Sequence, residues 1–112
     1  MDVQHTDVGD VRKVILAGRL DSAGVDLIEL RFGAVVVPAG KNTVVDMTEV
    51  SFLASLGVRM LLSTARALSR KGAKLALFGA TPAVMEVIET MGFNDIVPVA
   101  PSELEALAFV AG

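Results

Sequence analysis

The sequence predicts an α/β sandwich: a mixed sheet of about five strands with four helices, a parallel core and an antiparallel pair at the amino end. One observation is the apolar period, which switches repeatedly between strand-like and helical spacing. Another is the order of the expected elements, β-β-α-β-α-β-α-β-α, which is typical of parallel strands joined by helical crossovers. The third is size, because 112 residues, 53% of them hydrophobic, suit a single domain over residues 1–112.

The first two strands are expected to form a hairpin. Val3–Val8 is weakly strand-like, and Val11–Leu16 ends in three consecutive apolar residues. Gly9-Asp10 lies between them, and both residue types tolerate the positive φ of a tight turn. This hairpin supplies the antiparallel pair of the sheet.

A helix is expected to begin near Ala23, where Asp21 or Ser22 can accept a hydrogen bond from a free amide of the first turn. Apolar residues recur through it at helical spacing. Its end stays open, because Gly33 could stop the helix and Ala34–Val37 could prolong it.

The next two elements are a short buried strand, Asn42–Met47, and the most clearly patterned helix, Ser55–Lys71, with Gly72 just beyond its end. One face of this helix carries the apolar stripe expected to enter the core. That stripe consists of Val58, Leu61, Leu62, Ala65 and Leu68. The opposite face consists of Arg59, Ser63, Arg66 and Arg70.

The last third of the chain is expected to hold two strands and two helices. Lys74–Phe78 is a strand, and Thr81-Pro82 caps and starts a helix over Ala83–Met91. Asp95–Val99 reads as an edge strand, because its proline removes a ladder donor. Ser102–Glu105 has the pattern of a capping box that opens a terminal helix.

Composition excludes several function classes. The chain has no Cys and one His, His5, which excludes disulfides, thiolate zinc sites and cysteine catalysis. Its net charge of −3 argues against nucleic-acid binding. No apolar run reaches the length of a membrane span, and Met1–His5 lacks the features of a signal peptide, so we expect no membrane insertion and a cytoplasmic location.

Enzymatic signals are weak. The residues from Gly33 to Lys41 do not fit a phosphate loop, because six residues separate the glycines and Asn42 follows the lysine. The acids Asp21, Asp46 and Glu49 are spread along the chain, and no serine has a histidine partner that would complete a hydrolytic triad. We therefore expect no enzyme activity, no cofactor and no metal.

The most informative segment is Asp46–Arg59, which joins the expected third strand to the second helix. Ser55 lies at or beside the helix N-cap, where it could act only as a cap or could accept a phosphate. Gly57 leaves room for a partner to approach. Phe52, Leu53 and Leu56 form an apolar collar, part of it packing inward and part of it available for docking.

This segment resembles the signature of the STAS domain, the fold of bacterial anti-sigma factor antagonists. The matching pieces are Asp46-Met47-Thr48, Phe52-Leu53 and Ala54-Ser55-Leu56-Gly57. Further pieces in the right order are Ala17–Asp21, Lys71–Leu75, Pro82–Val84 and Thr90–Phe93. The resemblance covers nearly the whole chain and implies the STAS fold.

The resemblance also implies a mechanism. In that family the serine at the position of Ser55 is phosphorylated by an anti-sigma factor that is also a serine kinase of the histidine-kinase-like ATPase fold. The unphosphorylated antagonist binds this kinase and frees a sigma factor, and phosphorylation ends the binding. A serine phosphatase is a further expected partner. Two residues depart from the signature: Ala54 replaces Asp, and Leu56 replaces Ser or Thr.

The expected docking surface comprises Asp21, Phe52, Leu53, Ala54, Ser55, Leu56, Gly57, Arg59, Ser63 and Arg66. For the arginine stripe, an ordinary solvated helix face is an equal alternative. The alternative function is a non-phosphorylated STAS subunit of a lipid-transport ABC complex. The oligomeric state stays open between a monomer and a weak homodimer formed through an exposed apolar patch.

Overall fold

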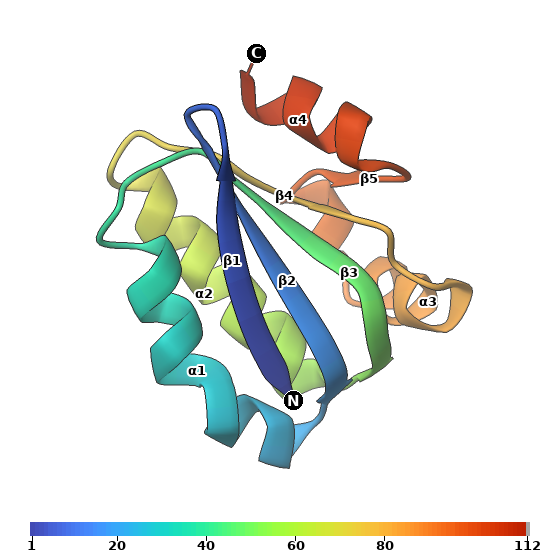
Figure 1. Cartoon of the computed structure of the whole chain (residues 1–112). Helices are drawn as coiled ribbons and strands as arrows, with labels where there is room; N and C mark the ends of the chain where they lie inside the picture. Colours follow the sequence, from blue (N-terminus) through green and yellow to red (C-terminus); the bar gives the residue numbers. More distant parts are fainter. Residues whose placement is uncertain (112) are drawn as a thin grey trace.

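Five strands form one mixed sheet, and their order across the sheet is their order along the chain. β1 pairs antiparallel with β2, and the remaining neighbours are parallel, as predicted (Figure 1). The computed structural model describes residues 1–111, so that Gly112 of the expected domain lies outside the described residues. The strands are β1 (Asp2–Val8), β2 (Val11–Leu20), β3 (Thr43–Leu53), β4 (Leu75–Phe78) and β5 (Val99–Ala100).

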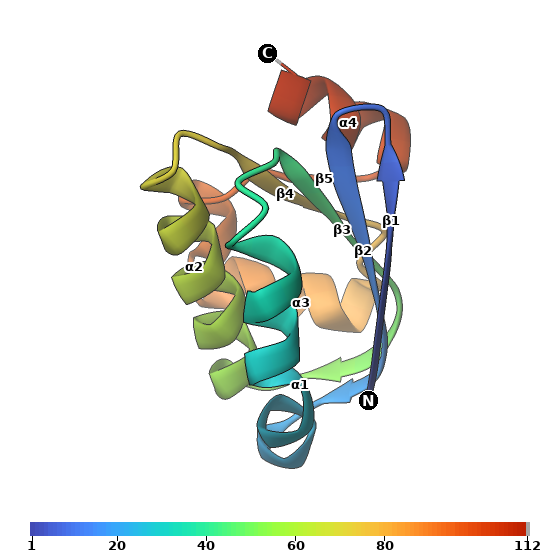
Figure 2. The same cartoon turned by 60° about the vertical axis from the view of Figure 1, so that its left-hand side comes forward.

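The four predicted helices cover the two faces of this sheet unequally. They are α1 (Ser22–Val36), α2 (Ser55–Ser69), α3 (Pro82–Thr90) and α4 (Glu103–Ala111). α1, α2 and α3 share the main apolar core with the sheet, and α1 and α2 lie side by side (Figures 1 and 2). α4 packs Ala106 and Val110 against Val44, Ala76 and Phe78 on the other face. Within residues 1–111, no helix has the length and apolarity needed to cross a membrane.

Three helices begin with the predicted side-chain caps. Asp21 accepts a hydrogen bond from the Gly24 amide (2.9 Å) at the start of α1. Thr81 caps α3 and Ser102 caps α4, each at 3.3 Å. The open question about α1 is settled, because the helix continues through Gly33 to Val36. Short polar side chains before an apolar run therefore locate these helix starts correctly.

Both central strands are longer than the predicted Val11–Leu16 and Asn42–Met47, because β2 continues to Leu20 and β3 to Leu53. Their pairing shifts register between Ile15 and Ala17 and again between Gly18 and Arg19. Such irregularities break the simple apolar alternation by which a strand is recognised in sequence. As a consequence, the informative segment up to Leu53 belongs to a strand and reaches the edge of the sheet in a fixed orientation.

The predicted last edge strand is present as β5, but the predicted range Asp95–Val99 is wrong, because the strand covers only Val99–Ala100. Residues Phe93–Asp95 form a short 3₁₀ helix, and the amide of Val97 donates back to the carbonyl of Phe93 (2.9 Å). Pro98 has no amide hydrogen, and pairing is confined to β5 after it. In this turn Val97 packs into the core, whereas Ile96 is 58% exposed.

Candidate functional site

The carboxyl ends of β2 and β3 bring two distant segments of the chain together at one edge of the sheet. Arg19 pairs with Phe52, and Leu20 pairs with Leu53. The Ala54 amide then donates to the carbonyl of Leu20 (3.0 Å), which ties the β3–α2 junction to the end of β2. α1 and α2 both begin at this edge, immediately after the two strands. We call it the carboxyl edge.

Ser55 is the first residue of α2, and its side chain is exposed. The N-cap is Ala54, whose backbone is extended (φ −100°, ψ 168°) and whose side chain makes no capping bond. Among residues 1–111 the Ser55 hydroxyl has no hydrogen-bond partner, so the interpretation of Ser55 as a cap only is wrong. The Ser55 hydroxyl is therefore accessible to a modifying enzyme from the solvent.

The predicted apolar collar around Ser55 divides into an outer and an inner part. Phe52 and Leu56 are each 41% exposed, whereas Leu53 is buried. The guanidinium carbon of Arg19 lies 4.5 Å from the centre of the Phe52 ring, a cation–π contact that holds the ring at the surface. Phe52 and Leu56 therefore form two apolar surfaces beside the exposed hydroxyl.

Gly57 has a different role from the predicted one. It is buried, and a Cβ added there would lie 2.8 Å from the side chains of Leu20 and Leu53 and 2.9 Å from the Leu20 carbonyl oxygen. Gly57 therefore lets α2 approach the sheet, and it leaves no space for a partner. Leu53 and Gly57, both predicted as docking residues, lie beneath the surface and support it from below.

Asp21 stands at the same edge, held by two groups. Its Oδ1 accepts the Gly24 amide (2.9 Å), and its Oδ2 accepts from Arg19 Nε (3.3 Å). The Gly24 amide, followed by the Arg19 guanidinium, lowers the pKa of this carboxyl below its ordinary 3.8. Asp21 is thus a fixed negative charge beside the Phe52–Arg19 pair.

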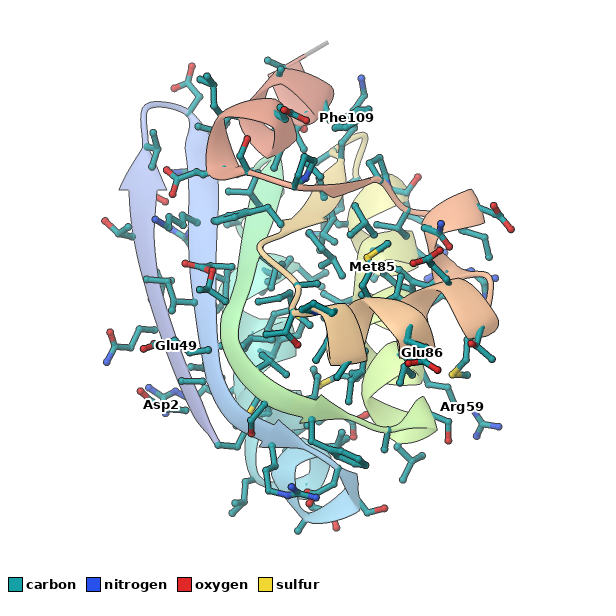
Figure 3. The ribbon with its side chains drawn as sticks, turned by 90° about the vertical axis from the view of Figure 1, so that its right-hand side faces the viewer. Asp2, Glu49, Arg59, Met85, Glu86 and Phe109 are labelled. Carbon is teal, nitrogen blue, oxygen red and sulfur yellow. The ribbon has the colours of Figure 1, made fainter. Side chains whose placement is uncertain are left out.

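The three predicted helix residues of the docking surface, Arg59, Ser63 and Arg66, are all exposed. At 100° per residue they fall on one face of α2, which Ser55 and Leu56 share. Figure 3 shows the Arg59 side chain extending from the first turns of α2 away from the sheet. The surface therefore continues from the carboxyl edge along α2.

Arg19 is the site residue that the sequence interpretation missed. It lies between Phe52 and Asp21 and contacts both. A strand ending at Leu20 would have placed Arg19 facing outward beside Asp21, but the predicted strand stopped at Leu16. Because the pairing of β2 is irregular, the sequence pattern did not indicate that the strand extends to Leu20 and includes Arg19.

The family model described as the STAS domain matches residues 2–106. The chain belongs to the STAS domain family. The Bordetella bronchiseptica protein named as anti-sigma factor antagonist BtrV is 35% identical over 95 residues, which are 84% of this chain and 82% of that protein. The Anti-sigma-B factor antagonist of Listeria monocytogenes is 25% identical over 98 residues, covering 88% and 81% of the two chains.

Solved STAS structures superpose on nearly the whole chain. The structure of an anti-sigma factor antagonist from Mycobacterium paratuberculosis has a TM-score of 0.89 and 26% identity, covering 99% of this chain and 94% of that one. Unphosphorylated SpoIIAA, also an anti-sigma factor antagonist, has a TM-score of 0.77 and 23% identity, covering 99% and 97%. The five-stranded mixed sheet with four helices is thus the STAS fold that the sequence predicted.

Ala54 occupies the N-cap position where the STAS signature carries Asp, and this departure gives a stability prediction. The extended backbone of Ala54 already has N-cap geometry, but it offers no acceptor to the free amides of α2. Ala54→Asp is therefore expected to stabilise the protein by about 1 kcal/mol, measured by urea unfolding. Ala54→Leu, which lacks an acceptor, serves as the control and should bring no gain. An Asp variant no more stable than the parent would contradict this assignment of the cap.

Proposed function

We propose that this STAS domain is an anti-sigma factor antagonist that acts by partner switching. Its unphosphorylated form binds an anti-sigma factor, which is also a serine kinase of the histidine-kinase-like ATPase fold, and thereby releases a sigma factor. Transfer of the γ-phosphoryl group of ATP to the Ser55 oxygen, with release of ADP and of the hydroxyl proton, ends the binding. A serine phosphatase resets the cycle by hydrolysis.

The observation that carries this proposal is the free, exposed hydroxyl of Ser55, on a segment that also exposes the apolar side chains of Phe52 and Leu56. Phe52 and Leu56 offer a partner an apolar contact, and the Asp21–Arg19 pair at the same edge offers it charged groups. Interfaces with apolar centres and polar rims bury the central groups away from water. Burying a hydroxyl in such a centre costs far less than burying a charged phosphate.

Phosphorylation would change this surface in two ways. A phosphate adds about −1.5 to −2 charges, which must lose their water if Phe52 and Leu56 are to stay covered. Arg59 lies four residues after Ser55 on the same exposed face of α2, within reach of the new phosphate. An Arg59–phosphate pair would occupy a guanidinium that the partner otherwise contacts. Both effects weaken docking without refolding the domain.

The family relatives support the general role. The Bordetella and Listeria proteins are named as antagonists of anti-sigma factors, and neither name mentions transport. Within residues 1–111, no group of three or more His, Asp or Glu side chains could hold a metal ion. We therefore rank partner switching above the lipid-transport subunit and above enzyme activity.

Affinity capture from the source cell tests the proposal. The tagged protein is expected to retain an ATPase of the histidine-kinase-like fold, and added ATP should release it from the wild type and leave it bound to Ser55→Ala. Capture of an ABC ATPase by both variants, with no release by ATP, would contradict the proposal and favour the transport subunit. The matched control is Ser69→Ala, at the far end of the same helix.

A further inference from the structure

The outer face of α1 carries an apolar stripe that the fold does not use. Leu27 is 72% exposed and Leu30 is 89% exposed, the two most exposed large aliphatic side chains of this helix. Ala23 and Ala34 are exposed on the same face, one turn before and one turn after them. The buried face of α1, with Val25, Ile28, Phe32 and Val36, is on the opposite side. Figures 1 and 2 show no element of the described chain over the outer face.

The spacing of this stripe is that of a coiled-coil seam. Ala23, Leu27, Leu30 and Ala34 are separated by four, three and four residues, which corresponds to the d, a, d and a positions of a heptad. Small residues at both ends and leucines in the middle allow two helices to approach closely around the leucine pair. A stripe of this kind needs a second helix with the same pattern.

The charged residues beside the stripe indicate that the second helix is α1 of another copy of this chain. Asp26 and Arg31 flank the stripe on opposite sides, because each lies about 70° from its centre at 100° per residue. In the heptad that this stripe defines, Asp26 is at position g and Arg31, five residues later, is at position e. In a parallel helix pair, a residue at g meets the residue at e that lies five places later on the partner helix. Asp26 of one copy would thus meet Arg31 of the other, twice across a two-fold axis. The terminal nitrogen of Arg31 that donates to the Val3 carbonyl (2.9 Å) leaves other guanidinium donors for this pair.

We propose that α1 is the contact surface of a parallel two-fold homodimer, with Leu27 and Leu30 of each copy at its centre. The second copy is the occupant because this one helix supplies both the apolar seam and both members of the ion pair. α1 and α2 begin at the same edge of the sheet, so the two carboxyl edges of the dimer lie at the same end. Each Ser55 stays outside the contact, since it belongs to α2.

The dimer is expected to be weak and concentration-dependent. A stable interface usually buries about 800 Å² on each partner, and four residues with two flanking charges cover less. Sedimentation equilibrium should therefore show a monomer–dimer equilibrium for the wild type. Leu27→Glu and Leu30→Glu should sediment as monomers at every concentration and keep the melting temperature of the parent, because both side chains are exposed. A wild-type chain that stays monomeric up to about 1 mM would overturn the proposal.

Cysteine cross-linking tests the geometry, and the chain has no natural Cys to interfere. A parallel two-fold pair places each seam residue opposite its own copy, within the Cα separation of about 4.4–6.8 Å that a disulfide needs. Ala23→Cys and Leu30→Cys should therefore each form a disulfide dimer under copper–phenanthroline oxidation, much faster than Ser63→Cys on α2. Oxidation no faster than that of the control would overturn the proposal. So would cross-linking only between Ala23→Cys and Ala34→Cys, which indicates antiparallel helices.

The outcome is independent of the proposed partner switching, because Ser55 variants should dimerise like the wild type. A monomeric protein whose anti-sigma factor binding is lost in Leu30→Glu would show that the stripe docks the partner, which would also overturn the homodimer.

Discussion

Ser55→Asp is expected to abolish anti-sigma factor binding and leave the fold intact. The substitution places a negative charge on the same exposed segment as the apolar side chains of Phe52 and Leu56, where a bound partner would exclude water. A charge buried without a partner typically costs about 3–5 kcal/mol. Each 1.4 kcal/mol is about tenfold in affinity, so binding should weaken by about 100-fold or more. Isothermal titration calorimetry with the purified anti-sigma factor measures this loss.

Although Ser55→Asp should weaken binding, its free energy of unfolding should not fall and should rise slightly. Position 55 is in the first turn of α2, where the helix dipole stabilises a carboxylate by about 0.3–1 kcal/mol. Ser55→Asp should thus melt at the temperature of the parent or slightly above it. Ser69→Asp, in the last turn of α2, is the control that should retain binding. Parent-like affinity of Ser55→Asp would contradict the docking role of this edge.

Gly24→Ala is expected to be strongly destabilising for so small a change. A Cβ at position 24 would lie 2.0 Å from the backbone oxygen of Arg19, a contact that no side-chain rotation relieves. The start of α1 would have to move away from β2 and would weaken the Gly24–Asp21 cap. We expect a loss of about 3 kcal/mol in the free energy of unfolding, at the upper end of the usual cost of overpacking.

Gly33→Ala is the matched control in the same helix. A Cβ at position 33 would meet nothing within 4 Å, and the residue has ordinary helical geometry. Alanine should therefore stabilise the protein by about 0.5–1 kcal/mol through its higher helix propensity. Urea unfolding compares the two variants directly. A neutral Gly24→Ala would show that the β2–α1 junction can relax, and it would contradict the fixed position of Asp21.

The sequence predicted the fold where local patterns were regular. The core stripe of α2, the caps of α1, α3 and α4, and the β1–β2 hairpin all depend on residues close together in the chain. The second halves of β2 and β3 depend on pairing between distant segments across two register shifts. No local period records such pairing, so both strands were predicted too short.

In the candidate site, too, the features set by local sequence were predicted and those set by tertiary contacts were not. Ser55 and the exposed arginines of α2 were predicted correctly as surface residues, because one helix positions them all. The inward role of Gly57 depends on how closely α2 packs on Leu20, which is a tertiary contact. Arg19 was missed for a similar reason, since its contact with Phe52 joins two strands far apart in sequence.

Locating the phosphorylated residue decides whether Ser55 is the switch. The purified protein is incubated with its anti-sigma kinase and ATP, and peptide mass spectrometry locates the added group. We expect one phosphoryl group on the Ser55 peptide, none on Ser55→Ala, and dissociation of the complex in step with the appearance of the phosphoryl group. Phosphate at another residue, or no phosphate while ATP still dissociates the complex, would contradict switching by phosphorylation of Ser55.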